Sequence, residues 1–211
     1  MPPAPLRART AVLLAVAAVL GGCGSASFRP AAAHDTDLAA AVHTLLAAGG
    51  FHLVYVDGDR SRTLVADVSA TGDAAGTLLV GSERFPFRSV AGRVFLQPTS
   101  GASWAELSGG DAAPYRAVPQ LLAALPACLA GTATPPADAG TATLDGERAR
   151  LLTYPTAGVE TDLSDRPHPY LVRFTRHRPG PVPAGCPGAD ITADISGVGS
   201  APQVRLPEGV R

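Results

Sequence analysis

The stretch GGFHLVYVDGD, residues 49–59, marks a change of structure along the chain. Its two glycines end an apolar pattern of three- and four-residue steps, which is typical of a helix. After them the pattern changes to a period of two, which is typical of a strand, and DGD is typical of a turn. The sequence therefore predicts a helix that runs directly into an antiparallel sheet.

The helix begins near residue 35, because Asp35, Thr36 or Asp37 can cap it. One face of this helix carries the apolar residues, namely Leu38, Ala41, Val42, Leu45 and Leu46. Such a stripe is expected to pack on the sheet.

Downstream, short β-rich runs are separated by the turn segments DGDR, TGDA, GS and VAG. These spacings predict hairpins in a meander. The predicted strands cover 51–56, 62–68, 76–80, 83–89 and 93–97, with a short strand at 104–107.

Residues 111–130 return to a helical pattern, but Pro114, Pro119 and Pro126 interrupt it. Each proline removes a backbone donor and clashes one turn back, so two or three short helical turns are expected. The following TATPPADAG, residues 132–140, is predicted to be a loop.

Further strands are predicted on both sides of the Asp145–Gly146 turn within 141–154, at 170–175, at 190–196 and at 203–206. The predicted fold class is therefore α+β. A strongly curved antiparallel sheet of about ten strands packs on a few helices, in one domain over residues 35–211.

Residues 11–20 form an apolar run preceded by Arg7 and Arg9, the layout of a secretory signal. The run is too short to span a ~30 Å hydrocarbon core. Leu20, Gly21, Gly22 and Cys23 resemble the lipobox of bacterial lipoproteins, in which the cysteine thiol carries diacylglycerol, with palmitate as a further acyl group. We expect 1–22 to be a cleaved lipoprotein signal peptide and 23–34 to be a lipidated N-terminus and flexible tether.

The alternative is an ordinary signal peptide cut near Ala26 or Ala33, with Cys23 incidental. The lipobox interpretation places the protein outside the cytoplasm, anchored to the outer face of the cell membrane through Cys23.

The 17 basic residues are all arginine, and they nearly balance 18 acidic residues. No basic stripe interleaved with aromatic residues is present, so nucleic acid is not an expected partner. The absence of lysine and asparagine is typical of a GC-rich genome and hints at an actinobacterial source.

Two further cysteines, Cys128 and Cys186, form an even pair that is expected to be oxidised outside the cytoplasm. The disulfide would stabilise the fold by roughly 4 kcal/mol, and two buried free thiols are the alternative. No cysteine or histidine spacing indicates a metal site, and no cofactor is expected.

The order of these elements resembles the LppX/LprG family of actinobacterial lipoproteins. The resemblance rests on GGFHLVYVDGD, VAGRVFLQPTSGASWAEL, TATLDGERARLLTY and ADITADISGVGSAPQVRLPEG, which follow one another across residues 35–207. It implies a half-barrel similar to LolA-type carriers, with an apolar cavity. That cavity would bind an acylated lipid or lipoglycan, for transport across the envelope. The candidate residues for lining the cavity or the core are Phe51, Trp104, Leu121, Leu125 and Phe174.

Alternatives to this interpretation remain. No G-x-S-x-G, HExxH or phosphate-binding loop is present, so we expect no enzymatic activity. Ser103 beside Trp104 could be a nucleophile, although a core or cavity role for Trp104 is favoured. An anchored envelope interaction module with a filled core and no lipid ligand is the second hypothesis, its partner protein unknown.

A final group of residues carries positive charge: Arg166, Arg173, Arg176, His177 and Arg178. They could meet anionic headgroups, or they could form a solvated and partly neutralised strand face. The other histidines considered, His34, His43 and His168, are expected to be surface residues because none has a partner at ligand spacing.

Overall fold

The computed structural model describes residues 34–98, 103–107, 117–200 and 203–207. The elements in chain order are α1 (His34–Ala47), β1 (Gly50–Asp57), η2 (Gly58–Arg60), β2 (Arg62–Ser69), β3 (Ala74–Val80), β4 (Glu83–Val90), β5 (Arg93–Leu96), β6 (Ala105–Leu107), α2 (Val118–Ala123), η4 (Leu125–Leu129), β7 (Ala137–Leu144), β8 (Glu147–Tyr154), β9 (Val159–Ser164), β10 (Leu171–His177) and β11 (Asp190–Ser196).

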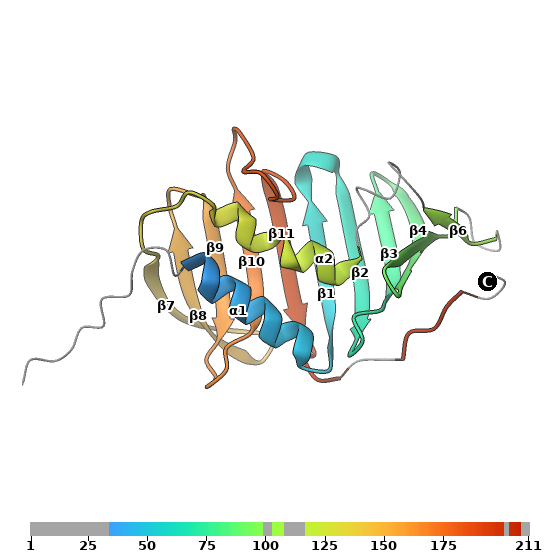
Figure 1. Cartoon of the computed structure of the whole chain (residues 1–211), viewed down its shortest axis with the longest axis horizontal. Coiled ribbons are helices and arrows are strands. Elements are labelled where there is room, and N and C mark those ends of the chain that lie inside the picture. The colour runs from blue at the N-terminus through green and yellow to red at the C-terminus, as the bar shows by residue number, and fades with distance from the viewer. Residues whose placement is uncertain (1–33, 99–102, 108–116, 201–202, 208–211) are drawn as a thin grey trace, which may run out of the picture.

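The described strands form one 11-stranded antiparallel sheet in the order β6-β5-β4-β3-β2-β1-β11-β10-β9-β8-β7 (Figure 1). Two meanders make up this order. They meet where β1 pairs with β11, with Leu53 opposite Ile195. Because β6 and β7 lie at opposite ends of the order, the described sheet is open.

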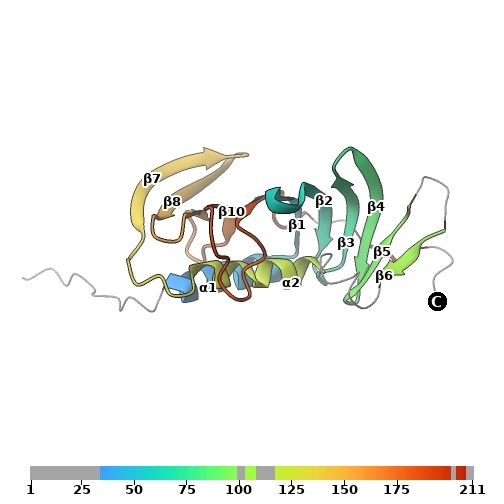
Figure 2. The same cartoon turned by 90° about the horizontal axis from the view of Figure 1, so that it is seen from above.

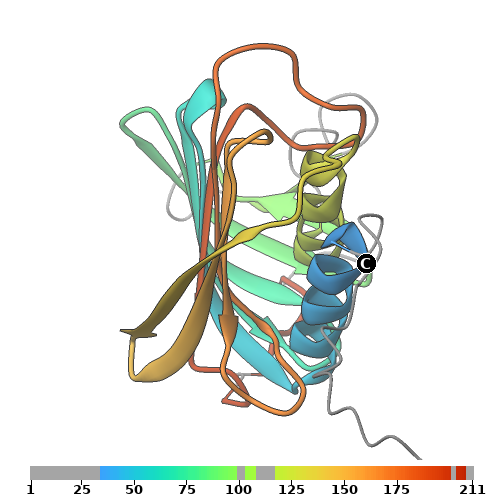
Figure 3. The ribbon, with the colours of Figure 1, turned by 90° about the vertical axis from the view of Figure 1, so that its left-hand side faces the viewer.

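Both α-helices lie on the same side of the sheet, which is bent and not flat (Figures 2 and 3). Figure 2 shows β5 and β6 at the level of α1 and α2, so this end of the sheet turns toward the helix side. We call the helix side the inner face. The expected α+β arrangement of an antiparallel sheet with few helices is confirmed.

The core lies between the helices and the middle strands. Alternate residues of β1 point inward and are buried, among them Phe51, Leu53 and Tyr55. Leu38 and Leu45 of α1 are buried against this face, as the apolar stripe predicts. The apolar residues repeat every two positions in the strand and about every 3.6 positions in the helix. Each element therefore presents one apolar face, and the two faces enclose a single continuous core.

The helical segment is broken as its prolines require. Pro119 stands in the first turn of α2 and Pro126 in the first turn of η4, where a missing N–H costs nothing. Cys128 of η4 is bonded to Cys186 in the loop between β10 and β11, as expected. The bond ties this loop across the helices.

Three details differ from the sequence-based expectations. Strand β9, Val159–Ser164, was not predicted, and β7 begins at Ala137 within the predicted loop. The predicted closing strand at 203–206 is wrong, because residues 203–207 form no strand. The chain leaves β11 between β1 and β10, so both edges of β11 are already paired. The carbonyl oxygens of Arg205 and Leu206 instead accept hydrogen bonds from Arg88 Nη1, each at 3.1 Å.

Candidate functional site

The inner face of strands β3 to β6 is apolar. Cross-strand register places Leu78 opposite Phe85, Phe87 opposite Leu96, and Val94 opposite Leu107. Facing pairs of an antiparallel sheet project to the same side, so these side chains form one surface. Leu78, Phe87 and Val94 are buried in it.

Four residues at the far end of this surface are half-buried, and we call them the apolar strip: Val80, Phe85, Leu96 and Leu107. Helix α1 packs most extensively on η4, and among the strands it packs on β10 and β1; α2 also packs on α1. Pro119 of α2 lies close to Gly72 in the β2–β3 turn. Among the described residues, the helices therefore leave the strip as an apolar part of the inner face that is only half-buried.

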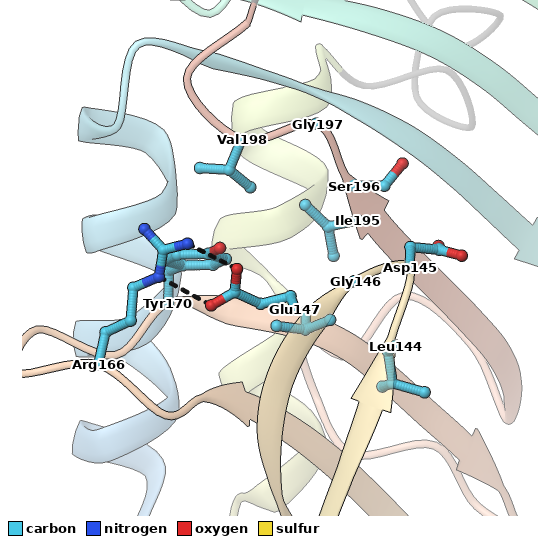
Figure 4. Close-up of a pocket in the computed structure, with 11 residues that line it drawn as sticks. Leu144, Asp145, Gly146, Glu147, Arg166, Tyr170, Ile195, Ser196, Gly197 and Val198 are labelled. Carbon is cyan, nitrogen blue, oxygen red and sulfur yellow. Dashed lines mark hydrogen bonds and ion pairs between the residues drawn. The ribbon is translucent and has the colours of Figure 1, made fainter.

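A second opening lies under the turn between β7 and β8 (Figure 4). Asp145 and Gly146 both adopt positive φ there, so the chain reverses tightly and brings Glu147 over the end of β11. Val172, Ile195 and Val198 supply apolar side chains to this pocket, whose volume is about 260 Å³.

The polar wall of this pocket is a three-residue cluster. Arg166 Nε and Nη2 donate to the two carboxylate oxygens of Glu147 at 2.7 and 2.6 Å, and its guanidinium lies 5.4 Å from the Tyr170 ring centroid (Figure 4). These bonds hold the pKa of Glu147 below its ordinary value. Burial, and next the hydrogen bond to Glu147, raise the pKa of Tyr170. The cluster is internally neutralised, so it forms a polar rim and does not present a free charge.

A third opening lies on the outer face, where Trp104, Arg88, Arg205 and Leu206 line a volume of about 310 Å³. The Arg88 guanidinium lies 5.0 Å from the Trp104 ring centroid. Ligand pockets usually occupy ~300–1,000 Å³. Both openings therefore fit one chain or one headgroup better than a lipid with several acyl chains.

Comparison with solved structures identifies similar folds, among them two mycobacterial proteins. LprF from Mycobacterium bovis superposes with a TM-score of 0.57 at 15% sequence identity, covering 85% of this chain and 99% of that one. The lipoprotein LppX from Mycobacterium tuberculosis superposes with a TM-score of 0.52 at 19% identity, covering 81% of this chain and all of that one, 100%. The chain has the LprF/LppX fold. No protein-family model matches the sequence, and no curated protein matches it.

The LprF/LppX fold confirms the resemblance at the level of architecture. The candidate lining residues lie in two different places in this fold. Phe51 and Phe174 are 2% and 0% exposed, and Leu125 is 0% exposed, in the core between sheet and helices. Leu121 is half-buried beside them. Trp104 lies apart, on the outer face, and the structure does not bring it together with the others.

The charged cluster of the sequence analysis does not form one surface. Arg173 pairs with Asp194 on the outer face, Arg166 pairs with Glu147, and His177 lies 3.0 Å from Asp190. Arg176 instead points inward and is buried. The strand alternation of Val172 and Phe174 already indicated that direction for Arg176.

Metal binding and membrane insertion concern residues 34–98, 103–107, 117–200 and 203–207, which the structure describes. Within these ranges, no three His, Cys, Asp or Glu side chains gather as metal ligands, and no helix is long and apolar enough to cross a membrane. His43 and His168 are exposed, and His34 is the first residue of α1. Cys23 and the lipobox residues Leu20, Gly21 and Gly22 lie outside the described residues, as does most of the tether.

Proposed function

We propose that this protein is a lipid-anchored envelope lipoprotein that binds an acyl chain of a lipid or lipoglycan along the apolar strip. The observation that carries the proposal is the strip itself, which lies on the inner face of a fold shared with LprF and the lipoprotein LppX. Binding rather than catalysis is the proposed activity.

The chemistry of the strip supports an acyl chain as ligand. Val80, Phe85, Leu96 and Leu107 come from four neighbouring strands. Covering such a surface gains about 25 cal/mol per Å² of apolar area removed from water. The strip consists of four side chains, so a ligand with several chains would bind through part of its acyl region. If the protein is a carrier, it would move that lipid across the envelope.

The anchor is part of the same proposal. A diacylated Cys23 would hold the folded body at the outer face of the membrane, since two acyl chains give stable attachment where one does not. The signal peptide at 1–22 and the short tether at 23–34 would place the strip close to the source of its ligand.

Native mass spectrometry of the full-length protein, extracted gently from its own membrane, tests acyl binding. We expect a noncovalent lipid adduct in addition to the covalent anchor. Phe85→Glu places a charge in the strip and should weaken binding of a fluorescent acyl probe about tenfold, or about 1.4 kcal/mol. Leu79→Glu is the matched control, because Leu79 is half-buried on the outer face of the adjacent strand.

An anchored interaction module is the second candidate function. The observation that favours it is the filled centre of the molecule, where Phe51, Leu125 and Phe174 are core residues. A bare polypeptide mass obtained repeatedly, with equal probe binding by the two variants, would support this module and contradict acyl binding.

A further inference from the structure

Arg176 is the largest fully buried side chain of the described residues and exposes 1% of its surface. It extends the inward-facing row of Val172 and Phe174 on β10, where a hydrophobic residue is the expected choice. Across the sheet it pairs with Val159 of β9 and Ile191 of β11, both buried and apolar. The guanidinium is thus set at the end of a hydrophobic core.

The protein satisfies this cation only in part. Arg176 Nη1 donates to the carbonyl oxygen of Gly188 at 2.8 Å, while Nε is buried with no hydrogen-bond partner among the described residues. No carboxylate of those residues forms an ion pair with Arg176. The negative charge of Asp59 raises the pKa of Arg176 without a direct contact. Asp59 Oδ2 accepts hydrogen bonds from the backbone N–H groups of Ala189 and Asp190, at 2.5 and 3.3 Å.

The electrostatic environment of the Arg176 guanidinium is therefore unfavourable. Burial, and next the neighbouring charge of Arg178, lower the pKa of Arg176, although arginine stays protonated in proteins. A buried charge without a partner is costly, and proteins ordinarily pair it. An anion between the two arginines would offset their mutual repulsion.

A pocket of suitable size lies at this position. Arg176 and Arg178 line it together with Thr132 and Thr156, and its volume is about 120 Å³. That is the space of about four waters at ~30 Å³ each, enough for a phosphate group and too small for an acyl chain. No acidic residue lines it.

The walls of the pocket are held in place. Cys128 lines it, and the Cys128–Cys186 bond ties η4 to the β10–β11 loop, which adds Pro181 and Pro183. Arg178 Nη1 donates to the carbonyl oxygen of Thr156, which orients the second guanidinium at the entrance. Donors fixed in this way lose little entropy when an anion binds.

We propose that this pocket binds a phosphate group, with Arg176 and Arg178 as its cationic donors and the hydroxyls of Thr132 and Thr156 as neutral ones. Arginine suits the role because its planar fork matches phosphate oxygens. The phosphate belongs either to a phospholipid headgroup or to the free anion. The site is separate from the apolar strip, since β2, β1 and β11 lie between β3 and β10 in the sheet.

The test uses the full-length protein in detergent and follows the Nε–H resonance of Arg176 by NMR. Inorganic phosphate and dihexanoyl phosphatidic acid are titrated separately, with chloride as the ionic-strength control. We expect a saturable shift of that resonance, because an anion in the pocket changes the electrostatic environment of the Arg176 guanidinium. Isothermal calorimetry should show binding at least tenfold weaker in Arg176→Met and Arg178→Gln, and unchanged in Arg148→Gln, which removes an exposed arginine charge.

The two ligands distinguish the source of the phosphate. Equal affinity for both supports a site for the free anion, and tighter binding of the lipid supports a headgroup. Arg178→Gln and the resonance of the unaltered protein keep the test valid if Arg176→Met does not fold. A resonance that phosphate and lipid both leave unmoved would overturn the proposal, whatever the outcome of the acyl-binding experiment.

Discussion

Asp57 is a second charged residue that the sheet turns inward. It ends β1, is 6% exposed, and its Oδ1 has no hydrogen-bond partner among the described residues. Burial raises the pKa of this carboxyl above its ordinary value, and the charge of Arg60 opposes that effect in part. Compared with the unfolded chain, the folded state thus shifts Asp57 toward the neutral acid.

Asp57→Asn is therefore expected to stabilise the protein near neutral pH. A raised folded-state pKa means that the folded protein binds the proton more tightly than the unfolded chain does. Stability is then fullest below the ordinary value of 3.8 and falls as the pH rises through the folded-state pKa. Asparagine keeps an acceptor for the backbone N–H of Arg60 and carries no charge.

Urea unfolding of both proteins between pH 4 and pH 7 measures this effect. The advantage of Asp57→Asn should grow with pH, while Asp67→Asn, at an exposed position of β2, should show no comparable gain. A variant less stable than the parent at pH 7 would show that attraction to Arg60 outweighs burial.

At the scale of elements, the close approach of β2 and β3 depends on Gly76. Gly76 lies between Ala66 of β2 and Phe87 of β4 in the register. A Cβ at this position would lie 1.9 Å from the Val65 carbonyl oxygen and 2.7 Å from Ala66 Cα. Both are backbone atoms, so the strands themselves would have to separate.

Gly76→Ala should lower the free energy of unfolding by about 2 kcal/mol, in the range for overpacking. Gly92→Ala is the control, because Gly92 has a φ of +78° and open space around it. That variant should lose only about 1 kcal/mol from backbone strain. Chemical denaturation measures the free energy of unfolding of the two variants and shows which loses more. Equal losses of stability would exclude a steric role for the position of Gly76.

Sequence patterns were sufficient to predict some of the helices and strands but not all of them. The helix before Gly49 and the first hairpins were predicted correctly because their signals are local. Strand β9 was missed because its VETDLS sequence is polar. Thr161, Asp162 and Ser164 are nevertheless buried, and Ser164 Oγ accepts from the backbone N–H of Tyr170 at 3.0 Å. Pairing with β8 and β10, and not side-chain hydrophobicity, makes this segment a strand.

At the scale of the molecule, location and fold depend on separate parts of the chain. Location rests on residues 1–23, which lie outside the described structure, and fold rests on the residues that follow. A lipidated cysteine would be the sole attachment predicted for this chain.

Cys23→Ser should therefore move the protein from the membrane fraction to the soluble fraction or the medium, with its fold intact. Cell fractionation with immunoblotting measures the distribution, and circular dichroism of the released protein checks the fold. Cys23→Ser protein that stays with the membrane after a high-salt wash would contradict anchoring through this residue.

The candidate site was predictable only in outline. Phe51, Leu125 and Phe174 are candidates from the sequence for lining a cavity or the core, and the sequence leaves open which of the two they do. The structure shows them in the core. The strip and the Glu147–Arg166–Tyr170 cluster join residues from distant strands, so no local spacing could reveal them.

The sequence by itself determined the alternation of most strands, the broken helices and the pairing of an even number of cysteines, because these depend on residues close together or on simple count. Only the tertiary structure decided that β11 is a central strand, that residues 203–207 form no strand, and that Arg176 is buried beside Arg178 with no ion-pair partner among the described residues. Those features depend on which edges and surfaces remain free after the two meanders have joined, and that choice is made by packing across the whole sheet.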